Sequence, residues 1–151
     1  MEYLFLLTLL ITSTASLADE ASVAANKEKT AEMREMLIGK WCGSKHLADG
    51  DYQRWMVNRK SDGTYAIKFT LTKKDKTSET WGEYGIWGIR YPIYFTAVRG
   101  FIDEGSSFPA DTNTPTLYDA FRVKNLTPDS FTYKSFTSGN TFTVSKKCNH
   151  E

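Results

Sequence analysis

The chain has 151 residues, of which 19 are Lys or Arg and 18 are Asp or Glu, so its formal net charge at pH 7 is +1. This length is typical of a single domain that can bury its own hydrophobic core. A nearly neutral charge balance argues against a nucleic-acid-binding protein, because that class normally carries an excess of basic residues.

The N-terminal residues predict export. Leu4–Ile11 form a short apolar block, and the small residues Ser16 and Ala18 are typical of a signal-peptidase site, which predicts a signal peptide over residues 1–18. The block is too short to cross a membrane, which takes about 20 apolar residues. No Lys or Arg precedes it, so a retained N-terminal anchor is the alternative. We expect a periplasmic or secreted protein with no transmembrane segment in the mature chain.

A polar segment rich in Ala, Glu and Lys follows the predicted cleavage site and contains no Gly or Pro. It predicts an N-terminal helical arm over residues 19–37. Thr30, Met33 and Leu37 recur at helical spacing, so the helix is expected mainly near residues 27–37.

From residue 38 to residue 151, short aromatic and β-branched segments alternate with turn residues, as in all-β domains. In Thr64–Thr72, apolar side chains alternate with small or polar ones, which is typical of a strand with one buried face. Short turns favour sequential hairpins over βαβ units. Eight strands are expected, at residues 40–45, 51–60, 64–72, 78–89, 91–100, 116–125, 130–136 and 141–148.

Eight strands in sequential hairpins predict an all-β fold, an eight-stranded up-and-down antiparallel barrel with a short N-terminal helix. Closure removes both sheet edges and leaves an interior for side chains or one small ligand. Cys42 and Cys148 lie in the first and last strands, which are neighbours in a closed barrel. We therefore expect a disulfide between them in an oxidising compartment, with two free buried thiols as the alternative. The longest loop, residues 103–115, is expected to form a mobile rim or lid.

Four segments resemble a known family: Gly39-Lys40-Trp41 after a short helix, Asp62–Tyr65, Gly82–Trp87 and Tyr118–Phe131. They are similar to segments of lipocalins and related calycins, and the resemblance covers residues 37–148. It implies a small exported lipocalin-like barrel in which Trp41 packs at the closed end. The family's Thr-Asp-Tyr motif is not matched here. The late Arg that packs across the Trp in lipocalins has Lys146 or Lys147 as its nearest counterpart.

The chain contains 4 Trp, 8 Tyr and 9 Phe, and these side chains either fill a core or line a cavity. Arg54 and Arg99 could also point inward, where Glu83, Asp119 or the carboxylate of a ligand would have to pair with them. Placement of these arginines on the surface is the default expectation. The candidate ligand-binding residues are Arg54, Tyr65, Phe69, Trp81, Trp87, Phe95, Arg99 and Phe121.

Residues for catalysis are not evident. His46 and His150 are the only histidines, so no histidine-based metal site is expected, and no cofactor is predicted. Neither a Gly-x-Ser-x-Gly motif nor a phosphate-binding glycine loop occurs. We expect no enzyme activity and assign no catalytic residue.

Two functions are compatible with these patterns. In the first, the barrel binds a small hydrophobic or amphipathic molecule in its interior, and the loop at 103–115 gates it. In the second, the barrel is filled, and the chain acts as an inhibitor or periplasmic chaperone that binds an exported protein through its loops or outer wall. Exposed aromatic side chains at Trp55, Tyr94 or Tyr133, together with the arm at 19–37, would then make the contact. We expect a monomer in either case.

Overall fold

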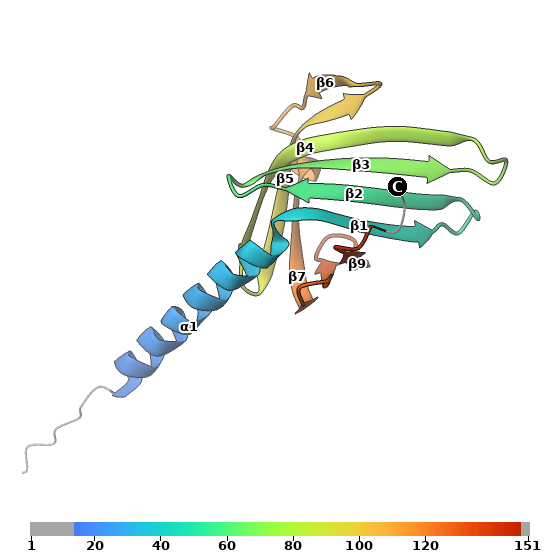
Figure 1. The fold of residues 1–151 in the computed structure, drawn as a ribbon. Coiled ribbons are helices and arrows are strands. Elements are labelled where there is room, and N and C mark those ends of the chain that lie inside the picture. The colour runs from blue at the N-terminus through green and yellow to red at the C-terminus, as the bar shows by residue number, and fades with distance from the viewer. Residues whose placement is uncertain (1–13, 149–151) are drawn as a thin grey trace, which may run out of the picture.

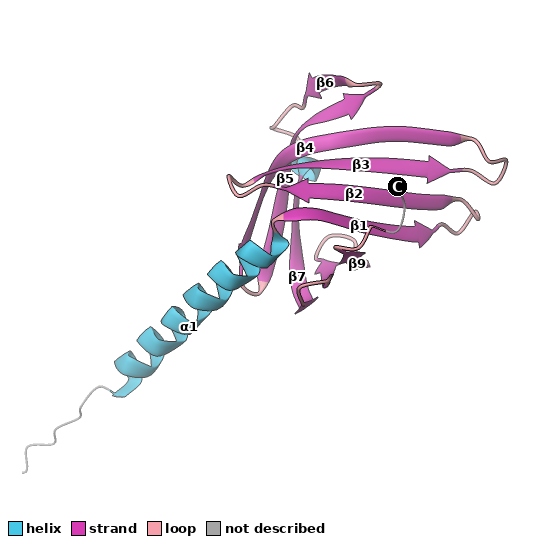
Figure 2. Ribbon diagram, viewed as in Figure 1, coloured by secondary structure: helices cyan, strands magenta, loops and turns pink. Residues whose placement is uncertain are grey.

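Eight antiparallel strands close into a barrel, and a long helix meets one end of it (Figures 1 and 2). The structure is a computed structural model that describes residues 14–148. Its elements are α1 (Thr14–Leu37), β1 (Gly39–His46), β2 (Tyr52–Arg59), β3 (Thr64–Thr72), β4 (Ser78–Arg90), β5 (Ile93–Asp103), β6 (Ser106–Pro109), the 3-10 helix η1 (Pro115–Leu117), β7 (Tyr118–Leu126), β8 (Ser130–Ser135) and β9 (Thr141–Ser145). The predicted all-β barrel with an N-terminal helix is confirmed.

The barrel is an up-and-down meander in which β4 pairs with β5, and β9 returns to pair with β1. The β1–β9 ladder has one register pair, Cys42 with Ser145. The predicted disulfide between Cys42 and Cys148 is present beside this seam, with a Cα separation of 5.3 Å. Strand β9 ends at Ser145, so Cys148 follows the last strand instead of lying in it as expected. The covalent link therefore ties the segment just after β9 to β1, beside the shortest ladder of the barrel.

The expectation of an unstructured loop at 103–115 is wrong in part, because β6 lies within it. Strand β5 pairs with β7 only over Ile93–Ala97, so the far end of β5 would otherwise present an unpaired edge. β6 pairs with that end, placing Phe108 opposite Phe101. The resulting β5–β6 hairpin projects from the end of the barrel that lies far from α1 (Figure 1).

The core follows from alternation along the strands. In β2, Trp55, Val57 and Arg59 are buried, and the residues between them are more exposed. Trp55 lies over Gly43 of β1, where an added Cβ would come within 2.4 Å of the indole ring. Glycine at position 43 therefore lets a large aromatic side chain fill the space inside the barrel.

One end of the barrel is closed by large side chains and by the last turns of α1. Leu37 and Trp41 are fully buried there, and the Trp41 indole donates a hydrogen bond to the Leu37 carbonyl over 3.0 Å. Arg34 lies over the Trp87 ring and donates to the Ser61 carbonyl in the β2–β3 turn. We call this end the floor. Lys146 lies 5.2 Å over the Trp41 ring, so it occupies the place that the lipocalin resemblance gave to Lys146 or Lys147.

Helix α1 begins at Thr14, earlier than the expected start near residue 27. Its side chains from Asp19 to Lys29 are exposed, and the helix projects away from the barrel (Figure 1). Residues 1–13 lie outside the described part of the chain, so the signal peptide over 1–18 and its cleavage after Ala18 stay predictions. Within residues 14–148, no helix combines the length and apolarity needed to cross a membrane.

Candidate functional site: the barrel interior

A cavity of about 400 Å³ lies inside the barrel. This volume falls in the range of pockets that hold small molecules, about 300–1,000 Å³. Most of its wall is apolar, and seven aromatic side chains contribute to it: Trp55, Tyr65, Phe69, Tyr94, Phe121, Tyr133 and Phe142. They come from β2, β3, β5, β7, β8 and β9, so nearly the whole circumference of the barrel takes part.

Three charged side chains of the cavity wall are at least partly buried: Arg59, Glu83 and Asp119. Arg59 is 1% exposed and lies at the floor, at the end of β2. Its Nε and Nη2 donate hydrogen bonds to the Tyr94 hydroxyl over 3.1 and 3.0 Å. Its Nη1 has no hydrogen-bond partner among residues 14–148.

Glu83 is the second charged group, on β4, and it forms no ion pair with any described residue. Burial raises the pKa of its carboxyl group above the ordinary value of 4.5. Burial also raises the pKa of the Tyr65 and Tyr133 hydroxyls, and the negative charge of Glu83 adds to the effect at Tyr65. Both phenols therefore keep their protons and can donate hydrogen bonds into the cavity.

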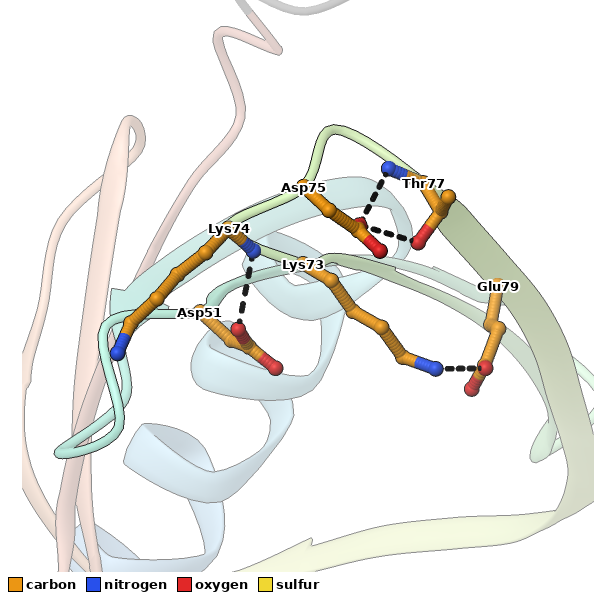
Figure 3. Close-up of polar contacts among 6 residues, drawn as sticks. All are labelled: Asp51, Lys73, Lys74, Asp75, Thr77 and Glu79. Atoms are coloured by element: carbon orange, nitrogen blue, oxygen red, sulfur yellow. Dashed lines mark hydrogen bonds and ion pairs between the residues drawn. The ribbon is translucent and has the colours of Figure 1, made fainter.

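The opposite end of the barrel, which we call the mouth, is formed by the β1–β2 and β3–β4 turns and by η1. Thr116 and Leu117 of η1 line the cavity there. Figure 3 shows how the two turns are joined: the Lys74 amide donates to the Asp51 carboxylate over 3.2 Å. Lys73 forms an ion pair with Glu79 across the β3–β4 turn. The Asp75 carboxylate accepts from the Thr77 amide and hydroxyl, which fixes the β3–β4 turn (Figure 3).

Three of the predicted ligand-binding residues line the cavity: Tyr65, Phe69 and Phe121. Trp81 is next to them, because its ring stacks on Phe69 with 5.4 Å between centroids. Trp87 is buried but belongs to the floor, where its indole donates to the Lys60 carbonyl over 3.1 Å. Neither tryptophan contributes to the group of aromatic side chains that surround the cavity.

Phe95, Arg54 and Arg99 lie outside the cavity: the expected inward position of Phe95 is wrong, and the two arginines take the surface placement. Phe95 is 41% exposed, and it lies opposite Gly88 on the outer wall, since Tyr94 and Thr96 on either side of it face the cavity. Arg54 alternates with Trp55 in the same way and faces outward.

Arg99 also faces outward, because Tyr94, Thr96 and Val98 form the inward set of β5. Gly85 of β4 pairs with Val98 and Tyr84 pairs with Gly100, so Arg99 has no partner across the ladder. Its guanidinium donates to the Tyr118 hydroxyl over 3.3 Å, and Tyr118 is itself 46% exposed. Arg99 therefore contacts the outer wall rather than the cavity.

The interior arginine is Arg59, which the sequence analysis did not single out. The alternation that places Trp55 and Val57 inward continues to residue 59, so extending it along β2 would have predicted that Arg59 also faces inward. Its position just before a turn made a solvent-exposed arginine the simpler expectation. The aromatic residues proposed as exposed anchors for a protein partner are also placed differently: Trp55, Tyr94 and Tyr133 are buried and face the cavity.

A larger hollow of about 930 Å³ lies on the outside of the barrel, over β2 to β4 and beside residues 102–105. Its border includes Lys68, Glu79, Thr80 and Glu104, all of which are exposed. It contains no buried charged side chain. The interior cavity is therefore the stronger candidate site.

No group of three His, Cys, Asp or Glu side chains within residues 14–148 is arranged to hold a metal ion. No protein-family model matches the sequence, and no curated protein matches it. Among solved structures, a lipocalin-like protein from Bacteroides uniformis ATCC 8492 is similar, with 17% sequence identity and a TM-score of 0.45. The match covers 74% of this chain and 98% of that chain. The interior cavity is the feature of this chain that indicates a function.

Proposed function

We propose that this chain is an exported barrel protein that binds one small, mainly apolar molecule in its interior. The observation that carries the proposal is the cavity of about 400 Å³ with an aromatic wall and an end bordered by polar turns. The disulfide between Cys42 and Cys148 supports an oxidising compartment, in agreement with the predicted signal peptide.

Gating by the segment 103–115 is part of the proposal. This segment leads directly into η1, and Thr116 and Leu117 of η1 border the cavity at the mouth. A movement of the segment would therefore change the width of the mouth without disturbing the ladders between barrel strands.

The test is titration with a neutral apolar fluorophore, N-phenyl-1-naphthylamine, followed by its own emission and by tryptophan emission. Saturable binding of one molecule per chain is expected. Thr96→Phe, which places a ring inside the cavity, should weaken binding at least about tenfold, since it removes the space that the ligand needs. Thr80→Phe, on the outer wall beside the external hollow, is the matched control and should bind as the native chain does. Equal binding by all three proteins would place the ligand elsewhere and contradict the proposal.

A second candidate is protein binding through the outer wall, and one observation favours it. Ile86, Phe95, Tyr118 and Phe136 are 38–52% exposed. The ladders place them close together: Ala97 pairs with both Ile86 and Tyr118, and Ala120 pairs with Phe95 and accepts the Phe136 amide. Phe95→Ser and Tyr118→Ser would separate the two functions, because they should leave fluorophore binding unchanged and abolish recovery of a specific exported partner.

A further inference from the structure

Arg59 is a buried cation without a counter-ion. It is 1% exposed, and no carboxylate among residues 14–148 forms an ion pair with it. Its neighbours are aromatic: the guanidinium carbon lies 5.0 Å from the centre of the Tyr94 ring and 5.7 Å from that of Phe131. An arginine keeps its charge under all physiological conditions, so this site cannot relieve the burial by losing a proton.

The hydrogen-bonding capacity of Arg59 is only partly used. The edge formed by Nε and Nη2 is occupied by the Tyr94 hydroxyl. Nη1 is buried and has no partner in the described chain, although Arg59 borders the cavity. A buried, unpaired cation is strongly unfavourable, and burial of a charge is normally tolerated only when a counter-charge and hydrogen bonds accompany it.

We infer that the ligand carries an anionic head, a carboxylate in its simplest form, and that Arg59 binds this head at the floor of the cavity. The inference rests on the proposed function and adds to it the chemical class and the orientation of the ligand. The head accepts a hydrogen bond from Nη1, and the apolar body lies between the aromatic walls with its far end toward the mouth.

Two tyrosines and two carboxyl groups of the cavity agree with this orientation. The Tyr65 and Tyr133 hydroxyls border the same cavity and keep their protons, so they can donate to an anionic head. The two carboxyl groups of the cavity lie nearer the mouth: Glu83 pairs with Ile67, one inward position beyond Tyr65, and Asp119 pairs with Thr96, one inward position beyond Tyr94. An anion is therefore favoured at the floor and disfavoured at the level of these two carboxyl groups. Lys45, the other cation of the cavity wall, is exposed at the mouth.

The experiment compares ligands that differ only in their heads: decanoate, 1-decanol and decyltrimethylammonium, titrated by calorimetry at about pH 8, where the carboxylate is ionised. The native chain is expected to bind decanoate at least about tenfold more tightly than 1-decanol, as for a charge-assisted hydrogen bond, and the cationic ligand most weakly. This comparison needs no variant. Equal affinity for decanoate and 1-decanol would overturn the inference and leave the proposed function standing. Failure of all three to bind would overturn both.

The variant Arg59→Met tests the residue itself, with Arg54→Met on the outer face of the same strand as the matched control. Arg59→Met should lose the preference for decanoate and keep its affinity for 1-decanol within about threefold. Because it replaces an unpaired buried charge by an apolar side chain, its midpoint of thermal unfolding should be unchanged or higher. Arg54→Met should behave as the native chain. An Arg59→Met protein that retains the preference for decanoate, or that loses both ligands together with stability, would show that Arg59 has only a structural role.

Discussion

The floor and the mouth of this barrel are built from the same strands by different means. At the floor, Leu37, the last residue of α1, and Trp41 of β1 are fully buried, and Trp87 and Phe131 pack with them. At the mouth, the β3–β4 turn is held by polar contacts within itself and by one hydrogen bond to Asp51 of the β1–β2 turn (Figure 3). The difference separates two tasks: the floor stabilises the fold, and the mouth leaves the interior accessible.

Arg59 belongs both to the floor and to the cavity wall. It is as deeply buried as the aromatic side chains of the floor, but it borders the cavity and keeps an unpartnered nitrogen. An apolar residue at position 59 would give a more stable floor, because the burial of an unpaired charge lowers stability. The proposed binding of an anionic ligand head would account for the presence of Arg59.

The largest effect is expected at the floor. Trp41→Ala should lower the free energy of unfolding by about 3–5 kcal/mol, because it removes a fully buried aromatic side chain and leaves a cavity. Phe69→Ala, on the cavity wall toward the mouth, is the comparison, and it should cost less because Phe69 already borders empty space and is only partly buried. Urea denaturation measures both. Equal losses would mean that floor and mouth do not differ in packing.

The next effect concerns the seam between β1 and β9, where the ladder has one register pair. Replacing Cys42 and Cys148 together by Ser should lower the free energy of unfolding by about 2–4 kcal/mol, because the disulfide closes a loop with a sequence separation of 106. Reductant should destabilise the native chain to a similar extent and leave the double variant unchanged. A native chain that is insensitive to reductant in urea would contradict this prediction.

A smaller effect is expected at Glu83. Because burial raises the pKa of Glu83, the folded chain holds this proton at pH values at which the unfolded chain has released it. The free energy of unfolding should therefore fall as the pH rises from about the ordinary pKa of 4.5 through the raised one. Glu83→Gln removes this contribution, so the variant should match the native chain below that window and be more stable above it. Parallel stability curves for the two proteins would contradict the assignment.

The smallest effect is expected at the rim of the mouth. Lys73 and Glu79 form an ion pair whose side chains are 41% and 58% exposed, and exposed pairs contribute little. Lys73→Met should leave the midpoint of thermal unfolding and the binding of the neutral fluorophore unchanged. A clear loss of stability would indicate that the joined turns of Figure 3 act as a structural unit of the mouth.

Much of the fold could be predicted because its signals are local. Alternation of apolar and polar residues, together with turn residues at regular spacing, predicted the eight barrel strands close to their observed positions. Closure followed from the number of hairpins, and the two cysteines at opposite ends of the chain agreed with it. β6 was missed because its sequence, Ser-Ser-Phe-Pro, is short, and it forms only against an edge that β5 leaves unpaired.

The site was predicted less completely, and the arginines show why. Alternation indicates that every second residue of a strand faces inward, but it does not say which of the two sets does so. In β5 the inward set is Tyr94, Thr96 and Val98, so Phe95 and Arg99 belong to the outward set. Tyr65 and Phe69 were assigned correctly to the interior because the apolar side chains of β3 alternate with small or polar ones, which marks the buried face.

The amino-acid sequence by itself determined the all-β barrel, the pairing of its two cysteines and an aromatic interior, because period, turn chemistry and residue type are properties of short segments. Only the tertiary structure decided which arginine is buried, how much space the aromatic side chains leave, and which end is closed. These features depend on side chains from distant strands meeting across the barrel, and no single segment contains that information.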